Sequence, residues 1–199
     1  MSQYKLALIA LGANLPSAGA DVGETLRLAA SILHENPNTT ITSFSRFWKT
    51  PAMPAGSGPD YVNAALTLRT TLPAQDLLSL LHEIEARFGR DRSTGRWSSR
   101  VLDLDLIALD DQILPDGDTQ RLCMRLSPER QRTSAPETLI LPHPRLQDRG
   151  FVLAPLAEIA PEWRHPVTGQ SVAQMLAALP DEATRGMTPF AAREMPVLP

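Results

Sequence analysis

The order in which strand-like and helix-like patterns follow one another constrains the fold of this chain more than any other feature. Runs of β-branched, aromatic or alternating apolar residues are separated by segments in which apolar residues recur every three or four positions. The expected elements, in chain order, are strand Lys5–Leu11, helix Val22–Leu33, strand Thr39–Trp48, strand Tyr61–Arg69, a helix from Pro73 to about Phe88 and strand Val101–Leu109. This strand-helix-strand order, used twice, predicts an α+β fold, a ferredoxin-like antiparallel sheet with helices packed on one face.

Turn residues separate these elements. Residues 49–60 are rich in proline and glycine and are expected to form a loop, and Gly89 is expected to end the second helix. Residues 111–138 show no clean periodicity and are longer than most loops of compact domains. They are therefore either a mobile functional element or an unstructured insertion.

The C-terminal part adds two expected helices, from about Gln147 to Ile159 and from Val172 to Leu179. We therefore expect one domain over residues 1–180, with a long loop at about 111–138, and a C-terminal tail over residues 181–199. The chain is long enough for a substantial core, since 43% of its 199 residues are hydrophobic.

Composition excludes several classes of protein. No apolar run approaches the 18 or more residues that span a bilayer, and the single cysteine, Cys123, excludes an internal disulfide framework. We expect a cytoplasmic protein that does not bind membranes, without an obligate protein partner and monomeric. The net charge is −3, whereas residues 87–100 carry five arginines against the single Asp91. One basic segment in a slightly acidic chain indicates a small, highly charged ligand rather than nucleic acid.

Two aspartates follow this basic segment directly. Asp103 and Asp105 alternate with Leu102, Leu104 and Leu106, so in a strand the acids share one face and the leucines the other. Carboxylates roughly 6.6 Å apart can jointly hold Mg²⁺, and arginine can bind phosphate oxygens in bidentate fashion. The simpler explanation is a half-buried strand whose acids are only solvated. Because the two features are contiguous, we favour a polyphosphate site.

A second group of residues is suited to a planar ligand. Tyr61 and Asn63 are two apart in an expected strand and face the same side, which combines an aromatic surface with an amide that donates and accepts. The alternative is that Tyr61 packs on the loop and Asn63 satisfies backbone groups. Phe151 is either an opposite aromatic wall or core, and His143, between two prolines, is expected in a stiff exposed turn within reach of phosphate.

These residues resemble a known family. Arg96-Trp97, Arg100, the pair Asp103 and Asp105, and the segments LGANL, PDYVNAA and PHPRL…RGF are similar to 6-hydroxymethyl-7,8-dihydropterin pyrophosphokinase over roughly residues 4–165. The resemblance implies a ferredoxin-like core and the transfer of the β,γ-pyrophosphoryl unit of MgATP to the pterin hydroxymethyl oxygen, a step of folate biosynthesis that releases AMP.

The resemblance also implies roles for individual residues. Asp103 and Asp105 would bind two Mg²⁺ ions and, with Arg92 and Arg100, form the catalytic set. The residues implied around ATP are Glu85, Arg92, Arg96, Trp97, Arg100, His143 and Arg149. The residues implied around the pterin are Tyr61 and Phe151, on its two faces, and Thr50, Pro51 and Asn63, along its polar edge. The chain departs from the family at Ser98 and Ser99, which stand where glycine and proline are usual, and this changes the flexibility of the segment.

Two other functions would use part of the same pattern. A different Mg²⁺-dependent nucleotidyl- or phosphotransferase could use the same paired acids, and its products would distinguish it. A nucleic-acid or ligand-binding module on a ferredoxin-like sheet would need exposed aromatic residues in an RNA-binding motif and a broad basic face. The sequence has neither of these features, and bare carboxylates would repel phosphate.

Overall fold

The protein is built around one antiparallel sheet. The structure is a computed structural model that describes residues 3–17, 20–52, 58–90, 101–127, 130 and 138–190. Within these residues the sheet has six strands in the order β5-β1-β4-β3-β6, and β2 also pairs with β4. The strands are β1 (Lys5–Ala13), β2 (Thr39–Phe44), β3 (Trp48–Thr50), β4 (Tyr61–Thr70), β5 (Asp103–Leu109) and β6 (Thr188–Pro189).

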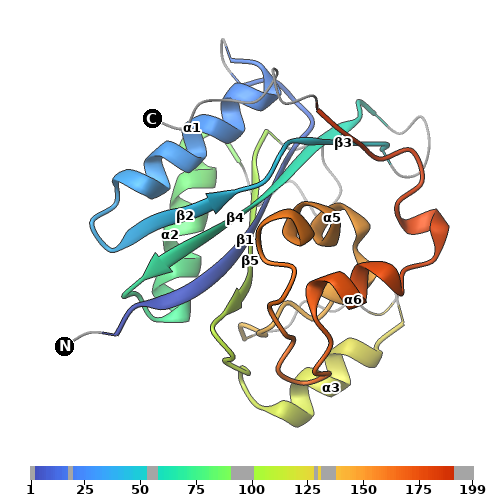
Figure 1. Cartoon of the computed structure of the whole chain (residues 1–199). Helices are drawn as coiled ribbons and strands as arrows, with labels where there is room; N and C mark the ends of the chain where they lie inside the picture. Colours follow the sequence, from blue (N-terminus) through green and yellow to red (C-terminus); the bar gives the residue numbers. More distant parts are fainter. Residues whose placement is uncertain are drawn as a thin grey trace.

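Strands β2 and β3 share the same neighbour. β2 pairs with the second half of β4 and β3 with its first three residues, so the two occupy one position beside it (Figure 1). Counted this way, the core runs β-α-β-β-α-β with each strand antiparallel to its neighbours, which confirms the α+β, ferredoxin-like expectation.

The prediction of a single strand over Thr39–Trp48 is wrong, because the strand breaks at residues 45–47. Ser45 Oγ accepts a hydrogen bond from the Ala65 amide at 2.9 Å, and the Ser45 amide donates to the Ala65 carbonyl at 2.9 Å. The Ser45 hydroxyl oxygen thus accepts the hydrogen bond of the Ala65 amide, which a main-chain carbonyl would accept if the strand continued without a break. The chain then turns Phe47 into the core and resumes as β3, so the expected loop over 49–60 begins only after Thr50.

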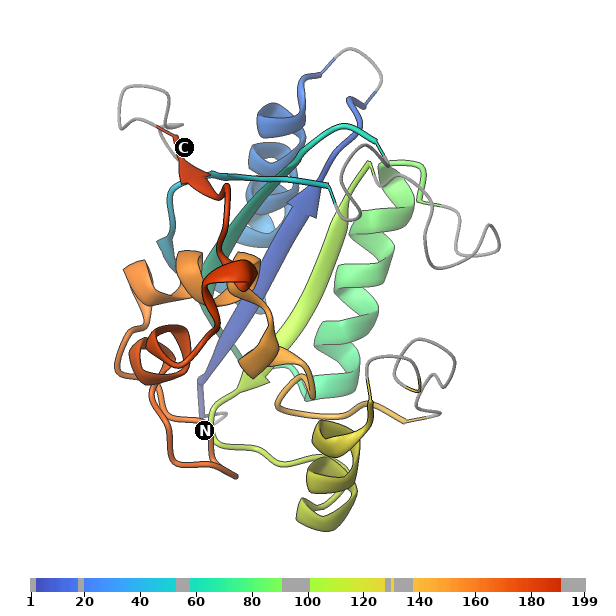
Figure 2. The ribbon, with the colours of Figure 1, turned by 90° about the vertical axis from the view of Figure 1, so that its right-hand side faces the viewer.

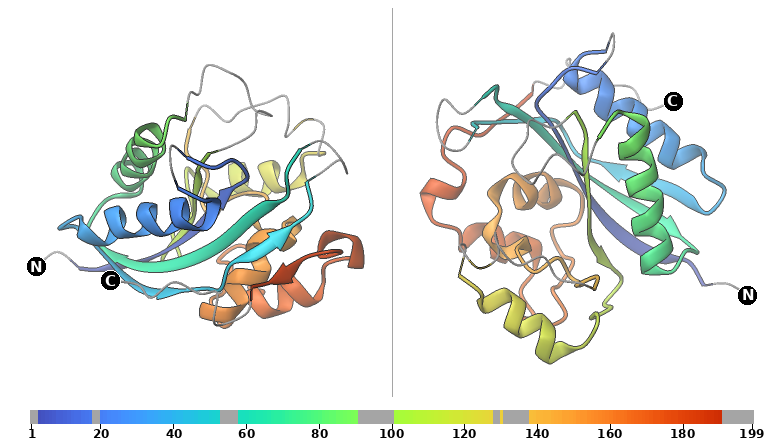
Figure 3. Two further views of the ribbon diagram at one scale, coloured as in Figure 1. Left: turned by 90° about the horizontal axis from the view of Figure 1, so that it is seen from above. Right: turned by 180° about the vertical axis from the view of Figure 1, so that it is seen from behind.

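Helices cover both faces of the sheet, whereas the sequence predicted helices on one face. α1 (Val22–Glu35) and α2 (Ala74–Arg87) lie on one side, and α5 (Gly150–Ile159) and α6 (Val172–Ala177) lie on the other. Figure 3 (left) shows the sheet between these two layers. β1 accordingly contributes Ile9 to the α1/α2 core and Leu8 to the α5/α6 core. Burial on both faces explains why β1 is apolar along most of its length.

The ends of the first two helices follow their sequence signals. Asp21 caps α1 by accepting a hydrogen bond from the Glu24 amide at 2.8 Å. Pro73 is the residue before α2, and Gly89, with a φ of +83°, ends the turn that follows Phe88. The predicted end of α2 is confirmed, since a positive φ is readily adopted only by glycine.

The stretch 111–138 is not an unstructured insertion in its described part. Residues Gly117–Arg125 form helix α3, which Asp116 caps by accepting from the amides of Asp118 and Thr119 at 2.9 Å each. Gln120 is fully buried and donates to the Pro142 carbonyl at 2.6 Å. This contact fixes α3 to the segment that precedes α5, and Figure 2 shows α3 below that segment.

The C-terminal elements are shorter than expected. The helix predicted from Gln147 is a 3-10 turn, η2 (Leu146–Asp148), followed by α5, and α6 ends at Ala177. The chain continues through η3 (Asp181–Ala183) to β6, which pairs with β3. Across the described segments, none of the helices has the length and apolar character needed to span a bilayer.

Candidate active site

The two aspartates of β5 face the α5/α6 side of the sheet. Leu102, Leu104 and Leu106 are at most 4% exposed and pack in the α1/α2 core, which confirms that acids and leucines occupy opposite faces. On β1, Gly12 lies opposite Asp103 and Ala10 lies opposite Asp105. Because these neighbours are small, a ligand can approach the sheet surface beside the carboxylates. This surface, around Gly12 and Ala10 of β1, is here called the floor of the site.

Arginines face both carboxylates. Arg90 Nη1 contacts Asp103 Oδ1 and also Glu85 Oε1, and Arg149 Nη1 lies 3.2 Å from Asp105 Oδ2. Burial by itself lowers the pKa of Arg90, but the negative charges of Asp103, Glu85 and Asp105 outweigh it and raise that pKa. The site therefore contains matched positive and negative groups that can exchange partners with a charged ligand.

Glu85, expected beside ATP, is 1% exposed and anchors α2 to β5. Its Oε1 accepts a hydrogen bond from the Leu104 amide at 2.7 Å as well as from Arg90. The sequence reasoning did not select Arg90, although it is one of the five arginines of the basic segment. Arg90 stands five residues after Glu85, beyond the end of α2, so the three- or four-residue spacing of helical ion pairs does not identify it.

Four of the predicted site residues lie outside the described residues, namely Arg92, Arg96, Trp97 and Arg100. Their assignments stay predictions. The described chain reaches Arg90 on one side of this segment and resumes at Val101 on the other, two residues before Asp103.

Asn63 and Thr50 form a buried polar pair on the same face of the sheet. Both are 6% exposed, and Asn63 Nδ2 donates to Thr50 Oγ1 at 2.6 Å. The Asn63 Oδ1 atom leans over Gly12, where a Cβ atom would lie only 2.8 Å from it. Because Gly12 is paired with both Asn63 and Asp103, the amide and the carboxylate are two strands apart, roughly 10 Å at the usual interstrand spacing.

The aromatic residues lie at the edge of this floor. Tyr61 is half-buried, pairs with Thr50 across β3 and β4, and shares a face with Asn63 as predicted. Phe151, in the first turn of α5, is 39% exposed, and the Arg149 guanidinium carbon lies 5.6 Å from its ring centroid. Because α5 packs on β4, both rings lie on the α5/α6 side. Phe151 is therefore not a core residue.

His143 lies against β5 rather than in an exposed turn. Its amide donates to the Ile107 carbonyl at 2.8 Å, and its Nδ1 accepts from the Arg145 amide at 3.1 Å. Removal from water, followed by the nearby charges of Arg149 and Arg145, lowers the pKa of His143 to about 3. The imidazole is therefore neutral at physiological pH, and its proton is on Nε2 because Nδ1 is an acceptor.

The site thus combines an acid pair, two facing arginines and a neutral imidazole at β5 with an amide, a hydroxyl and aromatic rings around β3, β4 and α5. Asp103, Asp105, Glu85, His143 and Arg149 gather around β5, and Thr50, Asn63 and Tyr61 gather around β3 and β4. Pro51 directly follows Thr50 and is exposed. This arrangement suits a ligand with phosphates at one end and a planar ring at the other.

Comparison with known proteins agrees with this chemistry. The sequence model of the 7,8-dihydro-6-hydroxymethylpterin-pyrophosphokinase (HPPK) family matches residues 8–161. A Synechocystis protein named 2-amino-4-hydroxy-6-hydroxymethyldihydropteridine pyrophosphokinase is 42% identical over 118 residues, which are 59% of this chain and 50% of that protein. A protein of the same name from Pseudomonas aeruginosa is 33% identical over 174 residues, which are 87% of this chain and 91% of the relative.

Solved structures agree on the fold. The chain matches wild-type HPPK-DHPS of Plasmodium falciparum with a TM-score of 0.63 at 12% identity, over 89% of this chain and 45% of that one. This chain therefore corresponds to less than half of that longer protein, and the likeness concerns the fold alone. The family match and the relatives establish that the chain belongs to the HPPK family, the ATP-dependent pyrophosphokinases that transfer pyrophosphate from ATP to hydroxymethyldihydropterin in folate biosynthesis.

Proposed function

We propose that this chain performs the pyrophosphoryl transfer of its family with Asp103 and Asp105 as the magnesium ligands and with the floor between β5 and β4 as the substrate site. The observation that carries the proposal is the row Asp103, Gly12, Asn63 across three strands. It supports the proposal because the Asp103 carboxylate and the Asn63 amide lie on one face of the sheet, separated by a residue without a side chain.

The acid pair suits magnesium that is shared with phosphates. Mg²⁺ is usually held by one or two carboxylates, with waters and substrate phosphate oxygens completing its shell. Within the described residues, no group of three or more His, Cys, Asp or Glu side chains could hold a metal ion by itself. The two aspartates would therefore supply the protein ligands of two ions and ATP the others. Bound Mg²⁺ neutralises phosphate charge and favours loss of the proton of the attacking hydroxyl.

The arginines would then change partners. If Asp105 held a cation, Arg149 would lose its counter-charge and could bind a phosphate oxygen instead. Arg90 would keep Glu85 as a partner even if Asp103 held a metal ion. Arg92, Arg96, Trp97 and Arg100, which lie outside the described residues, are proposed to bind ATP, and His143 is proposed to donate a hydrogen bond from Nε2 to an ATP oxygen.

The pterin is proposed to lie between Tyr61 and Phe151, with its donor-acceptor edge on Asn63, Thr50 and the chain at Pro51. The amide supports this proposal because Thr50 already orients it, leaving the Asn63 oxygen directed over Gly12. A site that positions a fixed amide against a heterocycle edge discriminates strongly against rings that lack the matching groups.

In the reaction, the hydroxymethyl oxygen of the pterin attacks the β-phosphorus of ATP in line with the bond to the α-phosphate bridging oxygen. A new oxygen–phosphorus bond forms as that bond breaks, AMP leaves with the bridging oxygen, and the hydroxyl proton passes to water. Positioning and charge neutralisation supply the catalysis, so no general-base side chain is required.

The test is incubation with ATP, Mg²⁺ and 6-hydroxymethyl-7,8-dihydropterin. AMP and pterin diphosphate should form in equal amounts, with no free pyrophosphate. Release of ADP would indicate a phosphotransferase, and release of pyrophosphate would indicate a nucleotidyltransferase, so either product would refute the proposed reaction. The monomeric state, the cytoplasmic location and the absence of nucleic-acid or obligate protein partners stay predictions.

A further inference from the structure

The chain beyond α6 returns to the edge of the substrate site. Residues 181–190, here called the C-terminal strap, run from η3 to β6 and then to Phe190. Figure 2 shows this red segment passing from the α5/α6 layer to the far edge of the sheet. The strap touches two elements that carry proposed pterin residues, the first turn of α5 and the chain around Thr50 and Pro51.

The first contact is at the start of α5. Gly150 is buried between Arg149 and Phe151, and a Cβ atom there would overlap the carbonyl oxygen of Ala183 in η3. The nearest approach is to backbone, which cannot move aside as the end of a flexible side chain can. As long as η3 packs directly on the helix terminus that presents Phe151, residue 150 must therefore be a glycine.

The second contact is at Pro51. Gly186 has a φ of +76°, and a Cβ atom at this residue would lie 2.9 Å from Pro51 Cγ. Immediately afterwards β6 pairs with β3. The Phe190 amide then donates to the Phe47 carbonyl at 2.8 Å, with the two rings edge-on at a centroid distance of 6.3 Å. The strap thus contacts Pro51 and pairs with β3 as the edge strand of the sheet.

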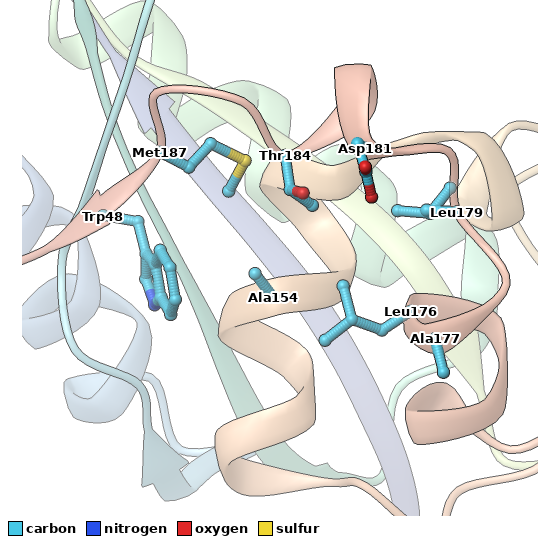
Figure 4. A pocket seen from close by; sticks show the side chains of 8 residues that line it. All are labelled: Trp48, Ala154, Leu176, Ala177, Leu179, Asp181, Thr184 and Met187. Atoms are coloured by element: carbon cyan, nitrogen blue, oxygen red, sulfur yellow. The ribbon is translucent and has the colours of Figure 1, made fainter.

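The strap crosses a hollow between these two contacts. A pocket of about 460 Å³ lies beneath it, lined by Trp48, Ala154, Leu176, Ala177, Leu179, Asp181, Thr184 and Met187. Figure 4 shows Thr184 and Met187 of the strap above this pocket, with Trp48 and Ala154 below. Because the middle of the strap lacks close packing on this side, its position is set mainly by its contacts at Gly150, Pro51 and β3.

We propose that the C-terminal strap is a positioning element for pterin binding, because it ties the turn of α5 that carries Phe151 to the β3 edge that carries Thr50 and Pro51. This inference rests on the proposed function, since it assigns the strap to the pterin half of that site. The contact at Gly150 directly follows Arg149, which is proposed to face ATP, whereas the Gly186–Pro51 contact lies at β3, three strands from the acids of β5. The Gly186–Pro51 contact therefore separates the pterin half of the site from the ATP half.

Two glycine variants test the strap. Gly186→Ala forces a Cβ atom against Pro51, whereas Gly169→Ala places one at a φ of +72° with no atom within 4 Å. Both variants carry the same cost of a left-handed backbone. Gly169 is therefore a matched control that differs only in the contact.

The readout is a comparison of KM values. Gly186→Ala should raise the KM for the pterin by about tenfold, with little change in the KM for ATP, because displacement of a positioning group by part of an ångström weakens the binding that depends on it. Gly169→Ala should leave both KM values unchanged while lowering Tm to a similar extent. Equal KM effects of the two variants, or equal effects of Gly186→Ala on both substrates, would overturn the proposal.

A second measurement needs no variant and decides the question if Gly186→Ala does not fold. Hydrogen exchange of wild-type residues 181–190 should slow when a pterin analogue joins an ATP analogue, because coupling between strap and site is reciprocal. Unchanged exchange in the strap would overturn the inference. Failure of the proposed function would look different, since wild-type enzyme would then release no AMP with the pterin.

Discussion

The variant Asp105→Asn is expected to reduce turnover strongly while changing the unfolding free energy little. The Asp105 side chain is 36% exposed, and its contact with Arg149 is 3.2 Å long. An ion pair this accessible contributes about 0–1 kcal/mol, so the variant should lose at most about 1 kcal/mol of unfolding free energy. For a chain of this size that is a fall in Tm of about 2–4 °C. Asparagine keeps the shape of the side chain while removing the charge that would hold the cation.

The catalytic loss should be larger. Removing one preorganised electrostatic group costs about 10²–10³-fold in kcat, or about 3–4 kcal/mol of transition-state stabilisation. The assay is AMP release at saturating pterin across a Mg²⁺ titration, in which the variant should also need more Mg²⁺. Asp118→Asn on α3 is the control, since it removes an equal charge and a 2.7 Å contact with Arg121 at an exposed site. A folded Asp105→Asn enzyme with near-normal turnover and Mg²⁺ dependence would refute the metal assignment.

Three further predictions concern the surroundings of the acid pair. Gly12→Ala should fold with nearly unchanged Tm but lose pterin affinity in a binding assay, since its Cβ would lie 2.8 Å from Asn63 Oδ1; unchanged affinity would contradict the proposed ring site. Glu85→Gln should lower the unfolding free energy in urea by about 2–3 kcal/mol, because Arg90 loses a buried counter-charge; a change below about 0.5 kcal/mol would show that the pair is not structural. Below pH 6.5 the unfolded chain binds a proton at His143 that the native state, with a pKa of about 3, does not. The unfolding free energy of the wild type should therefore fall, relative to that of His143→Asn, by up to about 1.4 kcal/mol per pH unit as the pH is lowered from 6.5 to 3. Parallel pH profiles of the two proteins would exclude this effect.

The sequence was sufficient to predict features that depend on neighbouring residues. Alternation in β5 placed Asp103 and Asp105 on one face and the leucines on the other, because successive side chains of a strand point to opposite sides. The same rule put Tyr61 and Asn63 on one face of β4. The order of elements predicted the sheet, since short connections and antiparallel pairing leave few arrangements.

Features that depend on distant contacts could not be predicted in this way. The buried residue of helix α3 is the polar Gln120, which fixes the helix through a hydrogen bond to the Pro142 carbonyl. The break after β2 depends on the bond between Ser45 and Ala65, residues that only the fold brings together. The local hydrophobic pattern of the sequence indicates which face of a segment is buried, but it does not indicate which other segment covers that face.

The same distinction applies to the site. The amino-acid sequence alone indicated that paired carboxylates, arginines, an amide and aromatic rings were available, and which of them share a strand face. The fold was needed to show that Arg90 is the arginine between Glu85 and Asp103, that His143 rests on β5, and that residues 181–190 contact the first turn of α5 and Pro51. The physical reason is that these contacts join segments far apart in the chain, whose approach is set by packing on both faces of the sheet.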